Sequence, residues 1–190
     1  MKIYNSLTRR KEEFAPIRPG RIGIYVCGPT VYDDPHIGHA SSAYIFDCIR
    51  RYLKYRGYKV TFVRNVTDVD DKIIEKATQS SKLKAQSLKL EKEVKEISRR
   101  YLAEYLESMA ILGIARPDKE RKATKYIPKM VNFVKLLIKK GRAYEADGDV
   151  YFDINKANDY GKLSNQKPDK MEAGARISPN ACTRRSNCSR

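Results

Sequence analysis

The sequence predicts an α/β fold built on a parallel sheet. An apolar run over residues 22–27 is typical of a buried strand, and a shorter run over residues 60–63 predicts a second one. Between them an amphipathic helix is expected from about Ala40 to Gly57, because glycine suits the position just after a helix end. A strand, a helix and a strand within about 45 residues form a βαβ unit, so the strands should be parallel and the crossover right-handed.

The elements near the N-terminus follow from local composition. Residues 3–5 are expected to form a short edge strand, and residues 6–20 a polar loop that ends in Pro19-Gly20. In the predicted helix, apolar side chains recur at helical spacing and should share one face: Ile45, Phe46, Ile49, Tyr52 and Leu53.

The second half of the chain is predicted to be mainly helical. Residues 65–71 form a turn rich in capping residues, a helix starts at about Asp70, and residues 78–87 are expected to be a loop. A long helix over 88–112 should be ended by Gly113 and Pro117. Its apolar stripe consists of Val94, Ile97, Tyr101, Tyr105, Met109 and Leu112.

The last predicted elements are a helix and a hairpin. The helix covers about 124–140, with Pro128 in its first turn. Two short strands over 143–153 should then pair around a turn at Asp147-Gly148. Residues 177–190 are rich in Ser, Asn and Arg without periodicity, which indicates a disordered tail.

Composition limits the classes of protein to consider. Lys and Arg exceed Asp and Glu by 39 − 23 = 16, which indicates either a polyanionic partner or lysine-rich solvated helices. No apolar run is long enough to span a membrane, and no signal sequence follows Met1. Four cysteines without paired spacing suit a reducing compartment, so we expect a cytoplasmic protein.

Both histidines of the chain, His36 and His39, stand where the predicted helix begins, with Gly38 between them. A strand, a glycine turn and a helix N-terminus form an anion site, and imidazoles placed there can donate hydrogen bonds to phosphate oxygens. The alternative is that the two rings cap or pack the helix. Likewise Asp68, Asp70 and Asp71 form either helix caps, which we favour, or a metal cluster.

Three strings of sequence resemble the cysteinyl-tRNA synthetase family of class I aminoacyl-tRNA synthetases. They are Lys-Ile-Tyr-Asn-Ser-Leu-Thr-Arg at 2–9, Tyr-Val-Cys-Gly-Pro-Thr-Val-Tyr-Asp at 25–33, followed by His-Ile-Gly-His at 36–39, and Asn-Val-Thr-Asp-Val-Asp-Asp-Lys-Ile at 65–73. The resemblance runs to about Arg176. It implies the first half of a class I Rossmann-like nucleotide-binding domain over 1–115, the start of the connective insertion over 116–176, and an aberrant tail over 177–190.

The resemblance also implies the site residues. His36 and His39 would be catalytic, and ATP would contact Pro29, Thr30, His36, Gly38 and His39. The amino acid would contact Cys27, Gly28, Thr30 and Thr67. Cys27 would be a zinc ligand that helps to select a cysteine thiolate, while the family's other three ligands lie beyond the resembling part.

The implied function is ATP- and Mg²⁺-dependent activation of cysteine to cysteinyl-adenylate, with transfer to tRNA(Cys). The second class I motif, Lys-Met-Ser-Lys-Ser, is absent, because Lys129-Met130 and Lys170-Met171 do not continue correctly. We therefore expect an N-terminal fragment with an incomplete zinc site and no complete reaction, from an enzyme that would be a monomer. The alternatives are a non-catalytic nucleotide- or RNA-binding fragment, and a ligase that joins cysteine to an amino-sugar in thiol biosynthesis.

Overall fold

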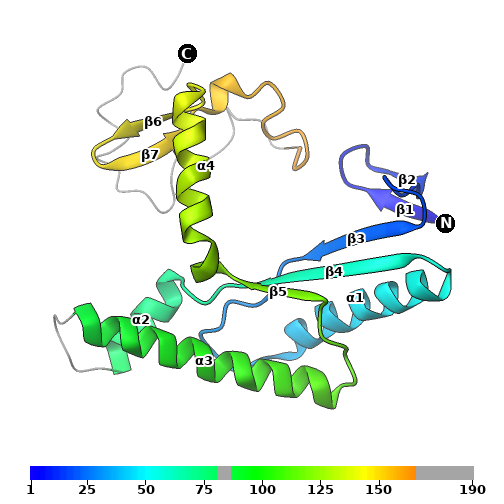
Figure 1. Cartoon of the computed structure of the whole chain (residues 1–190), viewed down its shortest axis with the longest axis horizontal. Coiled ribbons are helices and arrows are strands. Elements are labelled where there is room, and N and C mark those ends of the chain that lie inside the picture. Colours follow the sequence, from blue (N-terminus) through cyan, green and yellow to red (C-terminus); the bar gives the residue numbers. More distant parts are fainter. Residues whose placement is uncertain (81–86, 166–190) are drawn as a thin grey trace. The chain divides into compact units, whose positions relative to one another are not determined.

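The computed structural model describes residues 1–80 and 87–165. Its chain forms two compact units, one over Pro16–Ile127 and one that combines Met1–Ala15 with the chain from Pro128 (Figure 1). The predicted tail over 177–190 and most of the predicted loop over 78–87 lie outside the described residues, but residues 78–80 belong to a helix.

The first unit contains the predicted parallel sheet. Its strands are β3 (Arg21–Val26), β4 (Lys59–Val66) and β5 (Lys119–Lys122), in the order β3-β4-β5. Ile22 lies opposite Val60, and Val63 lies opposite Lys119, with both pairs of strands parallel. The α/β prediction is therefore confirmed. Strand β5 was not predicted, because its sequence, Lys-Glu-Arg-Lys, has no apolar residue.

Three helices complete this unit: α1 (Ile37–Tyr55), α2 (Asp71–Ser80) and α3 (Ser87–Ile111). The bounds of α3 match the prediction to within one residue. In contrast, α1 begins about three residues earlier than predicted, so His36 is its N-cap and His39 lies in its first turn. Strand β4 also extends to Val66, because residues assigned to a turn continue its alternating burial.

The core of this unit joins the helices to the ends of the strands. Val31, Val66, Ile73, Val94 and Tyr101 are among its buried residues, so α2 and α3 pack where β3 and β4 end. A second cluster places Ala40 and Ala43, near the start of α1, against Tyr105 and Met109 of α3, and Figure 1 shows the two helices diverging from this point. The predicted stripe of α3 is largely confirmed: Val94, Tyr101, Tyr105 and Met109 are buried, whereas Leu112 lies beyond the helix and is exposed.

The predicted apolar face of α1 is only partly correct. Leu53 is buried and Phe46 is half-buried, but Ile45, Ile49 and Tyr52 are exposed. The helix instead buries Asp47 and Arg50 on the adjacent face. Apolar periodicity did not reveal this face because its contacts are polar. Cys48, in the middle of the helix, is exposed.

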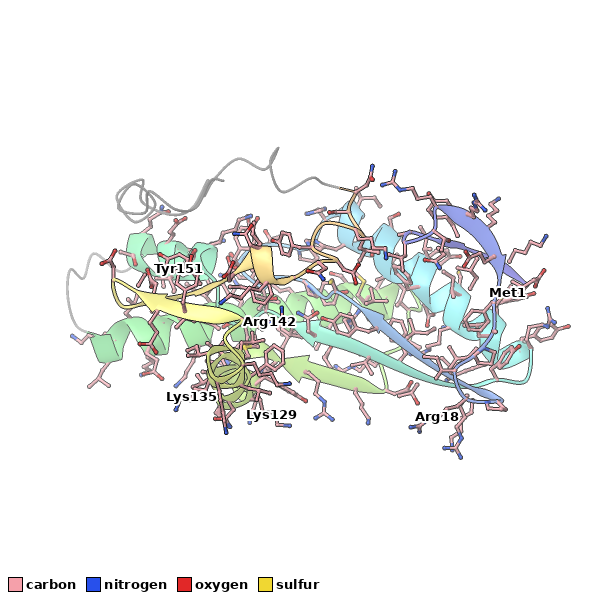
Figure 2. All side chains as sticks on the ribbon, turned by 90° about the horizontal axis from the view of Figure 1, so that it is seen from above. Met1, Arg18, Lys129, Lys135, Arg142 and Tyr151 are labelled. Carbon is pink, nitrogen blue, oxygen red and sulfur yellow. The ribbon has the colours of Figure 1, made fainter. Side chains whose placement is uncertain are left out.

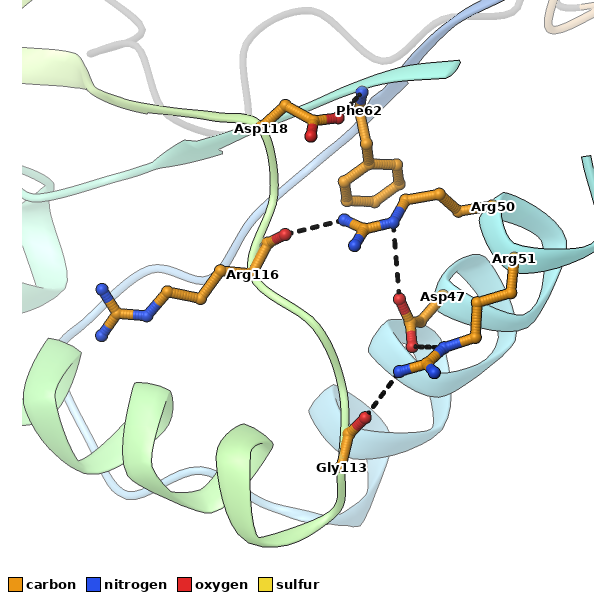
Figure 3. Close-up of polar contacts among 7 residues, drawn as sticks. All are labelled: Asp47, Arg50, Arg51, Phe62, Gly113, Arg116 and Asp118. Atoms are coloured by element: carbon orange, nitrogen blue, oxygen red, sulfur yellow. Dashed lines mark hydrogen bonds and ion pairs between the residues drawn. The ribbon is translucent and has the colours of Figure 1, made fainter. Parts of the chain in front are cut away.

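Figure 3 shows how these polar residues hold α1 to the segment that follows α3. The Asp47 carboxylate pairs with Arg50 at 3.6 Å and with Arg51 at 2.7 Å. Arg50 donates to the Arg116 carbonyl at 2.7 Å, and Arg51 donates to the Gly113 carbonyl at 2.8 Å. Asp47 thus orients two guanidinium groups that tie α1 to the chain leading into β5.

The second unit combines two hairpins and a helix. Strands β1 (Lys2–Asn5) and β2 (Arg10–Glu13) pair antiparallel, so the predicted loop over 6–20 contains a strand. Helix α4 covers Ile127–Lys139. It begins later than predicted, because the residues before it form a 3₁₀ turn, η1 (Ala123–Tyr126), which belongs to the first unit. Strands β6 (Ala143–Ala146) and β7 (Asp149–Phe152) form the predicted hairpin, and a 3₁₀ turn, η2 (Ile154–Lys156), follows.

The turn of this second hairpin has the conformation that its sequence demands. Asp147 and Gly148 both have positive φ, at 53° and 86°, which a two-residue hairpin loop of the Asp-Gly type requires. Within residues 1–80 and 87–165, no helix is long and apolar enough to cross a membrane.

Candidate functional site

The carboxyl ends of β3 and β4 lie side by side and carry the predicted site. Beyond the strands, Thr30 and Thr67 continue the parallel pairing as an isolated bridge. The Thr67 N–H donates to the Pro29 carbonyl at 3.1 Å, and the Val31 N–H donates to the Thr67 carbonyl at 3.3 Å. The two threonines predicted to share a crevice are therefore neighbours at the edge where open α/β sheets bind ligands.

Gly28 makes a close backbone approach between the two strand ends. Its N–H donates to Asn65 Oδ1 at 2.8 Å, and Tyr25 Oη donates to the same oxygen at 3.0 Å. A Cβ added at Gly28 would stand 1.7 Å from the Asn65 carbonyl oxygen. No side chain fits there, so glycine is a steric requirement of this strand end.

The two histidines cap the N-terminus of α1. The Gly38 N–H donates to His36 Nδ1 at 3.1 Å, and the His36 N–H donates to His39 Nδ1 at 3.2 Å. Together they form a reciprocal capping box made of imidazoles. The capping alternative is therefore confirmed. A Cβ at Gly38 would lie 2.9 Å from His36 Cε1, so here the glycine makes room for the ring of His36.

This cap fixes where each neutral imidazole carries its proton. Because Nδ1 of both rings accepts a backbone N–H, the proton must be on Nε2. The ring centroids are 4.0 Å apart, so the two rings are immediate neighbours. The first turn of α1 contains no acidic side chain, which leaves the positive end of the helix dipole uncompensated. Capping and phosphate binding are thus compatible, because each ring uses a different nitrogen.

Burial, assisted by the charge of neighbouring His36, lowers the pKa of His39 below its ordinary value of 6.5. The ring is therefore neutral at neutral pH. The unfolded chain binds a proton on this ring more readily than the folded chain does. Consequently the contribution of His39 to stability is full above pH 6.5 and is lost as the pH falls through the lowered pKa.

The variant His39→Gln provides a test of this pH dependence. Glutamine at the third helical position can maintain the capping box but does not titrate. We expect the Tm advantage of the natural chain over this variant to shrink between about pH 7.5 and pH 5.5, measured by circular dichroism. A Tm difference that stays constant over this range would contradict the lowered pKa.

A polar chain of side chains lies behind His39. The His39 ring meets Tyr105 edge-on, with centroids 6.2 Å apart. Arg64 donates to Tyr105 Oη at 2.8 Å and pairs with Glu120 at 2.9 Å. Burial raises the pKa of Tyr105, against the opposing charge of Arg64, so its hydroxyl stays protonated.

These supporting residues were not predicted from the sequence. Tyr105 was assigned to the core stripe, and the positions of Arg64 and Asn65 at the end of β4 were the only signal for their involvement. Glu120 lies in β5, which was itself missed. The polar chain connects this strand to the ring of His39.

The acidic residues after β4 have structural partners. Asp70 caps α2 by accepting the Lys72 N–H at 3.1 Å, as predicted. Asp68 instead binds Thr124, accepting its N–H at 3.0 Å and its hydroxyl at 2.6 Å. It thus caps η1, the turn after β5, in place of α2.

Cys27 is an exposed free thiol just after β3. Burial, followed by the influence of Cys27, raises the pKa of Tyr25. Within the described part of the chain, no group of three or more His, Cys, Asp or Glu side chains could hold a metal ion. The described residues therefore do not by themselves fit a zinc ion.

Comparisons with known proteins agree with this geometry. The family model described as tRNA synthetases class I (C) catalytic domain matches residues 13–188. A protein named cysteine–tRNA ligase from Finegoldia magna is 50% identical over 95% of this chain, and one from Sulfurihydrogenibium is 50% identical over 94%. A third, from Syntrophobacter fumaroxidans, is 47% identical over 95% of this chain. The chain spans a little over a third of these relatives, at 37%, 35% and 35% of their lengths.

A solved structure shows the same fold. A protein assigned as an arginyl-tRNA synthetase from Campylobacter jejuni matches with a TM-score of 0.57 and 14% identity. The match covers 76% of this chain and 40% of that protein. The family model and the relatives together show that this chain belongs to the family of class I (C) tRNA synthetase catalytic domains.

Proposed function

We propose that this chain carries the phosphate-binding and amino-acid-binding residues of a cysteine–tRNA ligase. The observation that supports the proposal most strongly is the pair of neighbouring histidines at the start of α1, beside the ends of β3 and β4. ATP, with Mg²⁺, would bind through Pro29, Thr30, Gly38 and the two imidazoles. The names of the relatives supply cysteine and tRNA as the other substrates.

In the proposed reaction the carboxylate of the amino acid attacks the α-phosphate of ATP. A bond forms between carboxylate oxygen and phosphorus, the bond to the bridging oxygen breaks, and pyrophosphate leaves. The Nε2–H groups of His36 and His39 would donate hydrogen bonds to the phosphate oxygens as negative charge builds on them. The Asp47 network and the Tyr105 chain would keep α1 and the His39 ring in place during this step.

Cysteine itself would bind near Cys27, Gly28, Thr30 and Thr67. Thr30 and Thr67 are paired neighbours, and the thiol of Cys27 is exposed just after β3. In the full family, zinc would hold the substrate thiolate. Because the described residues do not fit a zinc ion, we assign no step to zinc in this chain. The division into a nucleotide-binding part over 1–115 and an insertion over 116–176 stays a prediction.

An analogue of the reaction intermediate tests the proposal. A sulfamoyl analogue of cysteinyl-adenylate occupies the phosphate and amino-acid positions together, so we expect it to bind at least about tenfold more tightly than sulfamoyl adenosine. Isothermal titration calorimetry measures both affinities. Equal affinity for the two compounds, or no binding of either, would refute the proposal. Product analysis with tRNA and with amino-sugar acceptors then separates the two possible ligases.

A further inference from the structure

A short segment joins the end of β3 to the histidines of α1. Val31, at its start, is only 2% exposed and belongs to the core of the first unit. Residues 32–35 belong to no helix or strand, and Pro35 has no N–H to donate. The position of His36 relative to the strand ends therefore depends on what holds the side chains of this segment.

Helix α2 presents two lysines to this segment, four residues apart and therefore on one face of the helix. Lys72 Nζ lies 4.9 Å from the centroid of the Tyr32 ring, and Tyr32 itself packs against the core. Lys76 Nζ donates to Asp33 Oδ1 at 2.9 Å. Two successive residues of the segment are thus held by two successive turns of α2.

A buried tyrosine holds Lys76 on its other side. Lys76 Nζ donates to Tyr101 Oη at 2.7 Å and lies 4.3 Å from the centroid of that ring. Tyr101 is a core residue of α3 and is only 7% exposed. Hydrogen bonds to Tyr101 and then to Asp33 raise the pKa of Lys76, and the hydrogen bond from Lys76 lowers the pKa of Asp33. Both groups are therefore charged at neutral pH, and one ammonium group connects the segment to the core.

The surroundings of Lys76 differ from those of cations such as Arg18 and Lys135. Those two side chains are exposed and extend away from the ribbon in Figure 2. The Lys76 side chain is only 35% exposed and lies between Asp33 and Tyr101. An ion pair with an exposed carboxylate contributes little to the stability of a fold, and the Asp33 side chain is 59% exposed. The pair is therefore better suited to fixing the position of the segment than to stabilising the chain.

We infer that Lys76 is a positioning residue for the two histidines. Held by Tyr101, it fixes Asp33, which stands three residues before His36 in the chain. Three residues span at most about 11 Å, so a shift of Asp33 changes the position of the cap at the start of α1. Lys76 acts through this segment and not by contacting a ligand itself. This role rests on the proposed function, because the position matters for the contact between the imidazoles and the phosphates.

NMR spectra of the chain without ligand test the positioning itself. Lys76→Met keeps an unbranched side chain but removes its charge, and Asp33→Asn removes the charge of an exposed side chain. We expect both variants to shift the ¹⁵N signals of the His36 and His39 rings. Lys95→Met is the control, because it breaks an ion pair on the exposed side of α3 and should leave these signals unchanged. Ring signals that stay unchanged in Lys76→Met and Asp33→Asn would overturn the inference.

Calorimetric titration with ATP measures the consequence for the phosphate site. Since a displacement of about 1 Å can slow a reaction about a hundredfold, we expect Lys76→Met and Asp33→Asn each to weaken ATP binding about tenfold. Adenosine, which has no phosphates, should bind the natural chain and both variants equally. The double variant should lose no more than either single variant, because both changes break the same contact. Losses that add in the double variant, or equal losses for adenosine and ATP, would overturn the inference.

A conservative variant separates positioning from stability. Lys76→Arg keeps a charge that can pair with Asp33, so we expect it to restore most of the ATP affinity that Lys76→Met loses. Because the carboxylate is exposed, Asp33→Asn should change the Tm by no more than about 4 °C, measured by circular dichroism. A loss of ATP affinity that follows the loss of Tm across these variants would show a role in stability alone and would overturn the inference.

These outcomes are separable from the proposed function. Failure of the natural chain to bind ATP would refute the proposed function, and the ring signals of the variants without ligand would still decide whether Lys76 positions the histidines. Conversely, ATP binding that is equally strong in the natural chain, Lys76→Met and Asp33→Asn would overturn the positioning role and leave the proposed function intact.

Discussion

Gly28→Ala is expected to destabilise the chain by at least about 3 kcal/mol, the upper range for overpacking a close contact. The new methyl group would stand 1.7 Å from the Asn65 carbonyl oxygen and 2.8 Å from its carbonyl carbon. These are backbone atoms of β4, which cannot move without breaking the pairing with β3. Urea unfolding followed by circular dichroism measures the free energy of unfolding.

Strand β3, which ends two residues before Gly28, offers a control for this substitution. A Cβ at Gly23 meets nothing within 4 Å, and Gly23 lies inside β3. Since glycine weakens a strand by about 0.5–1 kcal/mol relative to alanine, Gly23→Ala should be neutral or slightly stabilising. If both variants unfold at the same urea concentration, β3 and β4 do not approach as closely as described.

Asp47→Ala is expected to lower the free energy of unfolding by about 3–5 kcal/mol, because it leaves a buried guanidinium without its counter-ion. The side chains of Asp47 and Arg50 are each only 8% exposed. The loss should also loosen α1, whose Arg51 would no longer be oriented toward the Gly113 carbonyl. The same urea unfolding measurement detects the lower free energy of unfolding. It also detects any change in the slope of that free energy against urea concentration.

Glu91→Ala serves as the control for this prediction. Its partner Lys95 is also four residues away on one helix, but both side chains are more than 60% exposed. An exposed pair of this kind contributes little to stability because solvent screens the two charges, so we expect only a small loss. Equal losses in the two variants would show that Asp47 behaves as a surface acid and that the network in Figure 3 does not hold α1.

Apolar patterning was sufficient for the parts of the fold whose contacts are apolar. The strands around Ile22 and Val60, the stripe of α3 and the Asp147-Gly148 hairpin were all predicted from period and turn chemistry. These signals are local, and burial of the same side chains produces both the pattern and the structure.

The elements that were missed depend on polar or distant partners. Strand β5 has four polar residues and joins the sheet through its pairing with β4 and through contacts such as Glu120 with Arg64. The buried face of α1 is centred on Asp47 and Arg50. Arg50 donates to the Arg116 carbonyl and its neighbour Arg51 donates to the Gly113 carbonyl, and both partners lie more than sixty residues away in sequence. The spacing of apolar residues along a short stretch of sequence cannot reveal partners that are so far away in the chain.

The candidate site, like the fold, was predicted only in part from the sequence. The position of the histidines beside a strand end was predicted, and so was the neighbourhood of Thr30 and Thr67. That the two imidazoles cap the helix with Nδ1 and keep Nε2 for a ligand required the structure, since it depends on where α1 begins. The roles of Asn65 and Tyr105 likewise depend on a tertiary approach.

Titration of the histidine side chains with ATP shows whether the two rings bind phosphates. In ¹⁵N-edited NMR spectra, we expect both rings to begin with a proton on Nε2, because Nδ1 accepts a backbone N–H, and we expect ATP to shift the Nε2 signals of His36 and His39. Adenosine, which has no phosphates, should leave them nearly unchanged. Binding of ATP without a shift at either ring, or equal shifts with adenosine, would contradict the assignment of these histidines to the phosphates.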